Sequence, residues 1–355
     1  MKVYDIAVIP GDGIGKETVP VGQKVMETVA DIHGGLKFNW HSFDWGCEYY
    51  LKKGRMMPDD GIKTLSQFHH IFLGAVGNPQ VPDHISLWGL LIPIRRQFQQ
   101  YINLRPVQVL RGLTSPLKQV DATIKFIIVR ENTEGEYSSV GGIVNRGLES
   151  GETALQVSSF SRTGCERVIR YAFERAKQTE RKRLVAATKS NGIIHTMPFW
   201  DRIFKEIAAE YPDVDAELTH VDALAAKMIL KPQAYDVIVA SNLFGDILSD
   251  LGGAVMGSIG IAPSANLNPE GRYPSMFEPV HGSAPDISGK SIANPLGQVW
   301  TACLLLEHIG EYSLARRVLD VVQDLLEERI VTPDLGGRYK TKDVEHALIT
   351  RLKNV

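Results

Sequence analysis

Cysteine is scarce in this chain, and its three cysteines, Cys47, Cys165 and Cys303, lie far apart along the 355 residues. An odd number of separated cysteines forms neither a disulfide framework nor a paired-cysteine metal site. The chain also has no uninterrupted apolar run of about 18 residues, so we expect no membrane-spanning helix. Its first residues lack the long apolar region and the cleavage site of a signal peptide. We therefore expect a cytoplasmic protein in a reducing compartment.

A surplus of positive charge is also absent. Lysine and arginine number 39 against 41 aspartates and glutamates, so the formal net charge is −2. This balance argues against a large nucleic-acid-binding surface, which depends on a basic patch. The short basic segment 177–183 contains Glu180 and is typical of a solvated helix end. We expect neither nucleic-acid nor membrane partners.

Short apolar runs and helical patterns alternate in a composition of 44% hydrophobic and 23% charged residues, which is ordinary for a globular protein. The length suggests two domains or one large domain. The alternation predicts an α/β fold with a largely buried sheet. Strands are predicted at residues 3–9, 71–73, 125–129, 184–187 and 237–240, and helices at residues 14–29, 162–178, 198–209, 243–251, 298–306 and 314–328.

A glycine-rich turn at residues 10–15, Pro-Gly-Asp-Gly-Ile-Gly, joins the first predicted strand to the first helix. This context is typical of a dinucleotide-binding turn. The spacing is GxGxG rather than GxGxxG, however, and the carboxylate of Asp12 would repel a pyrophosphate. A tight turn that needs positive φ is the better interpretation, with an anion at the helix N-terminus as the alternative.

Two aspartates, Asp246 and Asp250, lie four residues apart in the helical segment 243–251. This spacing puts both carboxylates on one helix face, where a divalent cation would relieve their repulsion. Oxygen ligands favour Mg²⁺ or Mn²⁺. A solvated helix face is the alternative, but the pair follows the predicted strand 237–240, at the strand end where α/β sheets bind ligands. A third acid, Asp222, opens another predicted helix.

Three arginines are candidates for binding a dicarboxylate. Arg95 and Arg105 lie ten residues apart, and Arg130 ends a predicted buried strand. A buried guanidinium cannot deprotonate and must find an anion, which it binds as a bidentate fork. Surface ion pairs remain the alternative, and Glu131 is an immediate rival partner for Arg130.

Tyr137 and Lys189 follow the ends of predicted strands. A lysine near a metal and several arginines would have its pKa lowered toward use as a base. A surface lysine at a helix start is the other interpretation of Lys189.

Taken together, these segments resemble the β-decarboxylating dehydrogenases, the family of isopropylmalate and isocitrate dehydrogenases. The resemblance runs over essentially the whole chain and rests on segments in a fixed order. They are IPGDGIG (9–15), GAVGNP (74–79), NLRP (103–106), VRENTEGEYS (129–138), ATKSN (187–191), VDALAAKMI (221–229), SNLFGDILSDLGG (241–253) and FEPVHGSAPDISGKSIANP (277–295).

The resemblance implies a fold of two α/β domains that share a large mixed sheet, which is not a Rossmann fold. Residues 1–99 and 252–355 would form a discontinuous nucleotide-binding domain, and residues 100–251 a dimerisation and substrate domain. The polar, glycine-rich segment at about 134–153 would be an arm that clasps a second copy in a homodimer.

Site roles are also implied by the resemblance. Lys189 resembles the base for the 2-hydroxyl, and Tyr137 the acid that protonates C3. Asp246 and Asp250 resemble metal ligands, and Asp222 resembles a third ligand that, like Lys189, comes from the other subunit and assists the base. Substrate carboxylates would bind Arg95, Arg105 and Arg130, next to a pocket wall with Leu91 and Ile92. The nucleotide loop would contain His281, Gly282, Ser283, Ala284, Asp286 and Asn294.

The implied reaction needs NAD and Mn²⁺ or Mg²⁺, with a requirement for K⁺ left open. The metal chelates the C2 hydroxyl and C1 carboxylate, the hydride leaves C2 for NAD, and CO₂ is lost. Asp286 would accept hydrogen bonds from the ribose and repel a 2′-phosphate, which favours NAD over NADP.

The segment 83–94, directly before Arg95, is expected to determine which substrate the protein accepts. Residues 90–94 offer no cation or hydroxyl for a third carboxylate, which argues against isocitrate, with Ser86 as the one exception in the segment. Segments such as VPDHISLWG resemble the branch that decarboxylates D-malate or oxidises tartrate. Relative to the isopropylmalate pattern, one more residue separates Gly89 from Arg95, and Pro93 is expected to bend the helix. 3-Isopropylmalate remains the alternative substrate.

The alternative function from a different functional class is that of a non-catalytic regulatory subunit. Such a subunit would lack one of the arginines, Lys189, Tyr137 or a metal-binding aspartate, and all are present here. The sequence does not decide between Mg²⁺ and Mn²⁺, or between a dimer and a tetramer.

Overall fold

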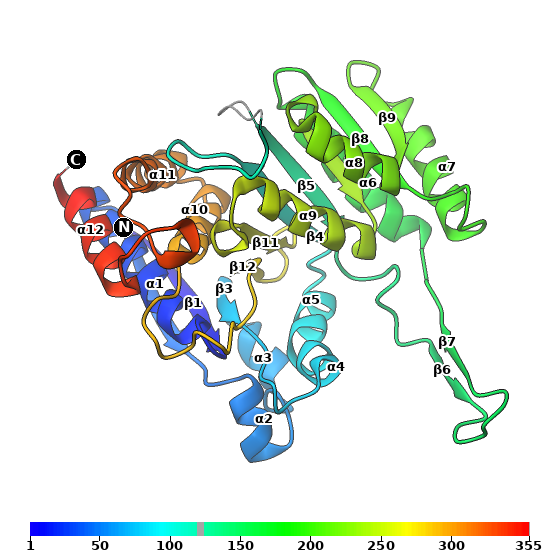
Figure 1. Ribbon diagram of the computed structural model, residues 1–355, viewed down its shortest axis with the longest axis horizontal. Helices are drawn as coiled ribbons and strands as arrows, with labels where there is room; N and C mark the ends of the chain where they lie inside the picture. Colours follow the sequence, from blue (N-terminus) through cyan, green and yellow to red (C-terminus); the bar gives the residue numbers. More distant parts are fainter. Residues whose placement is uncertain (119–123, 355) are drawn as a thin grey trace.

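The structure, a computed structural model, describes residues 1–118 and 124–354. Its centre is one ten-stranded sheet (Figure 1). β11 pairs antiparallel with β12 and β4, and β4 pairs antiparallel with β5, whereas the other neighbours are parallel. In spatial order the strands are β2 (Leu36–Ser42), β1 (Lys2–Gly11), β3 (His70–Ala75), β12 (Ser275–Pro279), β11 (Pro263–Leu267), β4 (Ile102–Gln108), β5 (Lys125–Glu131), β10 (Val237–Ala240), β8 (Arg183–Thr188) and β9 (Asp215–His220).

Helices cover the sheet, and the two ends of the chain lie together because α1 packs against both α10 and α12. α6 packs on β5 and β10, whereas α9 packs on β4 and β5. The helices are α1 (Gly15–His33), α2 (Cys47–Lys53), α3 (Gly61–Leu65), α4 (Asp83–Ser86), α5 (Ile92–Gln97), α6 (Arg162–Lys177), α7 (Thr196–Ala208), α8 (Val221–Leu230), α9 (Asn242–Met256), α10 (Leu296–His308), α11 (Tyr312–Glu327) and α12 (Thr341–Asn354). A π-helical turn, η1 (Leu87–Leu91), joins α4 to α5, and 3₁₀ turns lie at η2 (Pro232–Ala234), η3 (Ile259–Ile261) and η4 (Pro333–Leu335).

Alternation along the strands divides the core between the two sheet faces. Ile6 and Val8 of β1 belong to the larger buried cluster, together with residues of α1 and α10, whereas Ala7 and Ile9 belong to a smaller cluster with Leu90. This burial of both faces explains the continuous apolar runs in the sequence. The large mixed α/β sheet confirms the predicted fold class.

Each strand and helix predicted from the alternation is present, with bounds that differ by a few residues. β2, β4, β11, β12 and α12 were not among the predicted elements. β11 and β12 are short and completely buried, so they show no alternation of polar and apolar residues.

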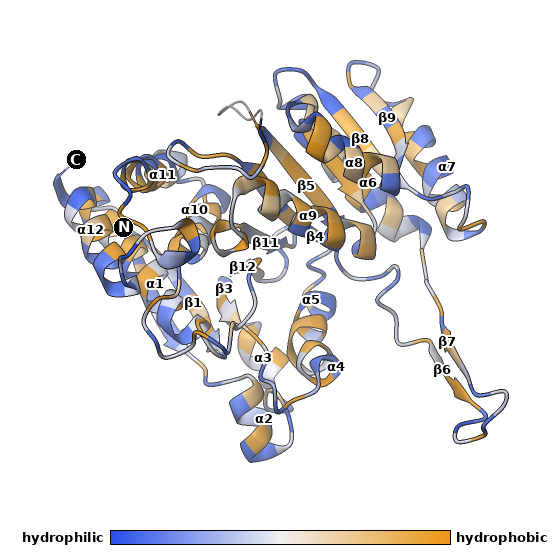
Figure 2. Cartoon of the chain, in the orientation of Figure 1, coloured by the Kyte–Doolittle hydropathy of each residue, from blue (hydrophilic) through white to orange (hydrophobic). Residues whose placement is uncertain are grey.

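A hairpin of β6 (Gly141–Val144) and β7 (Thr153–Gln156) protrudes from the rest of the chain (Figure 1). It lies in the segment for which an arm is predicted and extends beyond it to Gln156. Hydrophobic residues lie along this hairpin far from the core (Figure 2), and Ile143, Val144 and Leu155 are exposed. In the part of the chain that the structure describes, no helix is long and apolar enough to cross a membrane.

Candidate active site

Two arginines from neighbouring strands meet two aspartates of one helix near the middle of the sheet. Arg105 of β4 lies with its Nη1 atom 3.1 Å from Asp246 Oδ1 and 3.7 Å from Asp250 Oδ1. Arg130, on β5, pairs with the same oxygen of Asp246. The hydroxyl of Tyr137 donates a hydrogen bond of 2.9 Å to Asp246 Oδ2. We call Arg105, Arg130, Tyr137, Asp246 and Asp250 the arginine–aspartate cluster.

Arg130 is buried because α9 begins directly against it. Its exposed fraction is 2%, and its Nε and Nη2 atoms donate to Asn242 Oδ1 at 3.2 and 2.7 Å. A Cβ atom on Gly245 would lie 2.6 Å from Arg130 Cβ, so only glycine permits this close approach of helix and strand. Asn242, within the segment 241–253, is a site residue for which the sequence predicted no role.

A buried polar chain connects this cluster to Arg95. Arg95 Nη2 donates to Glu278 Oε1 at 2.6 Å, and Asn266 Nδ2 donates to the same oxygen at 2.7 Å. Asn266 Oδ1 in turn accepts from Asn103 Nδ2 at 2.9 Å, and Asn103 Oδ1 accepts from Arg105 Nε at 2.6 Å. The sequence predicted no role for Glu278, Asn266 or Asn103.

Burial and the neighbouring arginines shift the pKa values of Asp246 and Asp250 in opposite directions. Burial alone would raise the pKa of Asp246, but Arg130 and Arg105 outweigh it and bring the pKa below its usual value. Burial raises the pKa of Asp250, and Arg105 only partly opposes this. Burial and the charge of Asp246 also raise the pKa of Tyr137. The phenol therefore stays protonated at neutral pH, as a proton donor must.

Lys189 and Asp222 form a separate, exposed pair. Lys189 Nζ lies 2.8 Å from Asp222 Oδ2, and the Asp222 side chain is 66% exposed. The hydrogen bond from Lys189 is the main reason that the pKa of Asp222 is lowered. Among the described residues, no three His, Cys, Asp or Glu side chains are grouped to hold a metal ion. Within one chain, Asp222 therefore does not join Asp246 and Asp250.

The cluster offers two of the oxygen ligands that a hard divalent cation needs. Asp246 and Asp250 both contact Arg105, and the Asp250 side chain is 58% exposed, so its carboxylate is accessible to a cation from solvent. Mg²⁺ and Mn²⁺ prefer carboxylate and water oxygens. The donor set therefore fits such a cation, with the remaining ligands to come from water, substrate or a second chain.

The glycine-rich turn is held by Asp12. Its carboxylate is buried and accepts hydrogen bonds from the backbone N–H groups of Cys47 at 3.0 Å and Gly77 at 2.9 Å. Gly13 has a φ of +54°, and a Cβ atom there would lie 2.0 Å from the carbonyl oxygen of Ser283. Asp12 is thus structural, and the tight-turn interpretation is confirmed.

This turn packs against the candidate nucleotide loop, because Ile14 N–H donates to the carbonyl oxygen of Ser283 at 2.9 Å. His281 Nε2 is buried without a hydrogen-bond partner among the described residues, and burial lowers the pKa of His281. Asp286, further along the same loop, is exposed. Asn294 Nδ2 donates to Asp334 Oδ2 at 2.9 Å. An unpartnered ring nitrogen and a free carboxylate fit an adenine nucleotide. The other predicted loop residues are Gly282, which is exposed, and Ala284, which has a φ of +40°.

The segment before Arg95 contains the π-helical turn η1 between α4 and α5. A π turn closes its hydrogen bond over one more residue than an α turn, which fits the additional residue between Gly89 and Arg95. Leu91 is partly buried and Ile92 is buried. The hydroxyl of Ser86 donates to the carbonyl oxygen of Asp83 at 2.9 Å, so it is used within its own helix.

Comparison with known proteins assigns the family. Residues 5–348 match the family described as isocitrate/isopropylmalate dehydrogenase. The chain is 54% identical over 356 residues to the probable tartrate dehydrogenase/decarboxylase of Bacillus subtilis, covering 100% of this chain and 99% of that protein. It is 49% identical to the D-malate dehydrogenase (decarboxylating) of Escherichia coli, covering 98% of both. The isocitrate dehydrogenase structure from Methylococcus capsulatus matches with a TM-score of 0.89 at 34% identity, covering 99% of each chain. The chain therefore belongs to the isocitrate/isopropylmalate dehydrogenase family of oxidoreductases.

Proposed function

We propose that this protein oxidises and β-decarboxylates (2R)-malate-type substrates with NAD and Mg²⁺ or Mn²⁺, converting D-malate to pyruvate and CO₂ or oxidising tartrate. The arginine–aspartate cluster carries the proposal, because it places guanidinium groups for carboxylates beside two oxygen ligands for a cation. The relatives named for tartrate and D-malate support this substrate class, since they align over nearly the whole chain.

The arginines hold the substrate by its carboxylates. Arg105 and Arg130 are already fixed by neighbouring side chains, so little conformational entropy is lost when they bind an anion. Arg95 is held by Glu278 in the same way. Bidentate guanidinium–carboxylate contacts also orient the reacting C2–C3 bond.

Two side chains move protons. Lys189 accepts the proton of the C2 hydroxyl as a neutral amine, and Asp222 orients its Nζ atom and stabilises the ammonium that forms. Tyr137 donates its proton to C3 after CO₂ leaves, and Asp246 fixes its hydroxyl for that step. A bound divalent cation would polarise the C2 oxygen, and bound NAD would accept the hydride.

The complete site requires a second copy of the chain. Lys189 and Asp222 form an exposed pair that does not join the cluster of their own chain, so in the proposed homodimer they complete the partner's site. The exposed apolar residues of the β6–β7 hairpin suit a clasp between two copies. In this arrangement residues 100–251 form the dimerisation and substrate domain, and residues 1–99 with 252–355 bind the nucleotide.

Substrate choice is assigned to the segment around η1. Leu91 and Ile92 would form an apolar wall beside Arg95, and residues 90–94 carry no cation or hydroxyl for a third carboxylate. Isocitrate is thereby disfavoured. The choice of NAD over NADP rests on Asp286, whose exposed carboxylate would repel a 2′-phosphate.

The direct test compares kcat/KM for D-malate, L-tartrate and 3-isopropylmalate with NAD and Mn²⁺ on one preparation. We expect D-malate or tartrate to exceed 3-isopropylmalate by about tenfold or more, since one methylene alone is worth about this much and the isopropyl group is larger. A higher value for 3-isopropylmalate would overturn the substrate assignment and leave the family intact. No NADH formation with any of the three would overturn the proposed reaction.

A further inference from the structure

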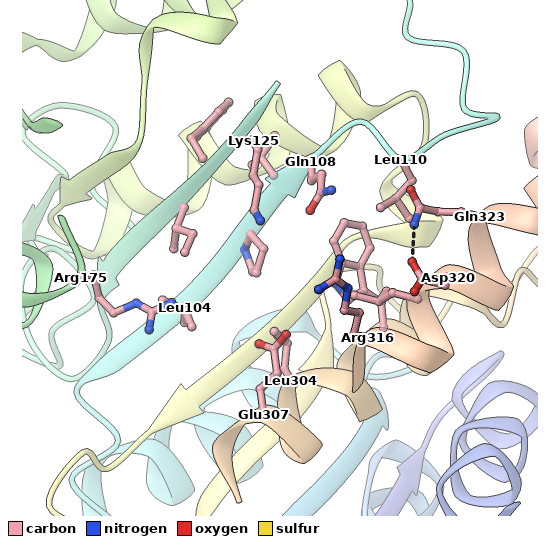
Figure 3. A pocket seen from close by; sticks show the side chains of 16 residues that line it. Leu104, Gln108, Leu110, Lys125, Arg175, Leu304, Glu307, Arg316, Asp320 and Gln323 are labelled. Carbon is pink, nitrogen blue, oxygen red and sulfur yellow. Dashed lines mark hydrogen bonds between the residues drawn. The ribbon is translucent and has the colours of Figure 1, made fainter. Parts of the chain in front are cut away.

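The face of the sheet opposite the arginine–aspartate cluster is left partly uncovered. On this face α6 packs on β5 and β10, and α10 packs on β11 and β12, so β4 lies between the two helices. A cavity of about 560 Å³ opens there, and we call it the rear cavity (Figure 3). Its volume lies in the range of small-molecule sites, about 300–1,000 Å³. It is lined by residues of β4, β5, α6, α10 and α11.

The rear cavity is distinct from the candidate active site. Successive residues of a strand point to opposite faces. Arg105 of β4 faces Asp246, whereas its neighbour Leu104 lines the rear cavity. In β5, Arg130 faces the cluster, and Lys125 and Ile127 line the rear cavity. Both sites therefore share strands but not side chains.

Three cations reach the rear cavity from three different elements: Lys125 from β5, Arg175 from α6 and Arg316 from α11 (Figure 3). None of them forms an ion pair with a residue that the structure describes, although ion pairs are frequent elsewhere in the chain. Arg175 Nε is also buried without a hydrogen-bond partner within the described ranges. Guanidinium and ammonium groups that converge unpaired on a recess attract an anion.

The remaining lining defines what kind of anion fits. Leu104, Leu304 and Trp300 provide an apolar surface, and two acids, Glu307 and Asp320, oppose the three cations. The carboxylate of Glu307 has no hydrogen-bond or ion-pair partner among the described residues, and burial raises its pKa, which the charges of Arg175 and Lys125 partly oppose. An apolar surface with a few converging charged groups is the usual design of a small-molecule pocket.

We propose that the rear cavity binds a small organic anion, in which a carboxylate or phosphate pairs with Lys125 and Arg175 while an apolar body rests on Leu104 and Leu304. Arg316 closes the opposite wall, and Glu307 limits the affinity by repelling the anion.

Calorimetric titration with phthalate and with phenyl phosphate tests this site, because these probes join one aromatic ring to a carboxylate pair or to a phosphate. Arg175→Gln and Lys125→Met should each weaken binding by about tenfold, as expected for losing a charge-assisted hydrogen bond. Glu307→Gln should tighten binding, because it removes a negative charge and retains the shape.

Arg170→Gln is the matched control. Arg170 lies on α6 like Arg175 but pairs with Glu210 and is not part of the cavity wall, so binding should not change. Weakening by Arg175→Gln together with tightening by Glu307→Gln supports the site, since general damage to the fold would not produce opposite signs. Stronger binding of one probe identifies the preferred anionic group. Absence of binding by both probes, or equal responses of Arg170→Gln and Arg175→Gln, overturns the proposal.

Discussion

The arginine–aspartate cluster and the Lys189–Asp222 pair carry complementary chemistry in very different surroundings. Arg130 is 2% exposed and is fixed by Asn242 and Asp246 before any ligand binds. The Asp222 side chain is 66% exposed, and its ion pair with Lys189 lies at the surface. A buried charge must be paired within its own chain, whereas an exposed charge is stabilised by solvent and remains available to a second chain. The difference fits the proposal that the cluster binds the substrate and that the Lys189–Asp222 pair completes the site of a second copy.

Mixing two inactive variants gives the sharpest test of this comparison. Lys189→Ala should lower kcat by about 10²- to 10⁴-fold because the proton acceptor is lost, and Arg130→Gln should abolish substrate binding. In a heterodimer of the two, one site would combine an intact cluster with an intact Lys189. Unfolding and refolding them together should restore about a quarter of the wild-type activity, because half of the dimers are mixed and each has one intact site.

The control for the first variant is Lys182→Ala, which removes another exposed lysine that is paired with an aspartate, Asp213. Its NADH formation should match that of the wild type. If the mixed sample stays inactive while each variant is folded and dimeric, both groups act within one chain, and the comparison is wrong.

Arg130→Gln should also be the most destabilising single change at the cluster. It removes a buried charge and leaves the carboxylate of Asp246 with weaker compensation, which costs about 3 kcal/mol of unfolding free energy. Chemical denaturation of the metal-free protein measures this. Arg162→Gln, which removes an exposed arginine paired with Glu166 and Glu206, should have an effect below about 1 kcal/mol. Equal losses for both variants would contradict the contrast between buried and exposed pairs.

Asn266→Leu tests whether the buried polar chain positions the arginines. Asn266 links Glu278 to Asn103, so the substitution leaves buried polar groups without partners and should cost about 2 kcal/mol. It should raise KM for the substrate more than it lowers kcat, because Arg95 and Arg105 lose their alignment. Asn39→Leu, at a partly exposed asparagine that donates to Asp5, provides a control that should leave KM unchanged. An unchanged KM in Asn266→Leu would show that the chain serves only stability.

The sequence predicts the two parts of the site unequally, for a physical reason. Arg130 could be found because it lies at the end of the apolar run of β5, and Asp246 because it lies in the first turns of α9, directly after the apolar strand β10. Asn266 and Glu278 could not be found, since their roles depend on the register that pairs Asn266 with Asn103, 163 residues away in the chain. Local patterns report local structure, and a pairing between distant strands leaves no periodic signal in either segment.

The segment before Arg95 gives a second example. Relative to the isopropylmalate pattern the segment has one more residue, and Pro93 is expected to bend the helix. The structure instead places the irregularity one turn earlier, in the π-helical turn Leu87–Leu91, and Pro93 lies in the first turn of α5. Proline is tolerated there because the first N–H groups of a helix have no partner within it.

The smallest expected effect is a difference in pH dependence between Asp246→Asn and Asp222→Asn in metal-free protein. The pKa of Asp246 is lowered in the folded state, so its contribution to stability is present above its usual value of 3.8 and is lost as the pH falls below it. The loss of stability in Asp246→Asn should therefore be largest near neutral pH and should shrink in acid. Asp222 also has a lowered pKa, but its exposed pair is screened by solvent, so Asp222→Asn should follow the wild-type curve at every pH. Denaturant midpoints across an acid series measure both. An equal response of the two variants would mean that the cluster is no more preformed than the exposed pair.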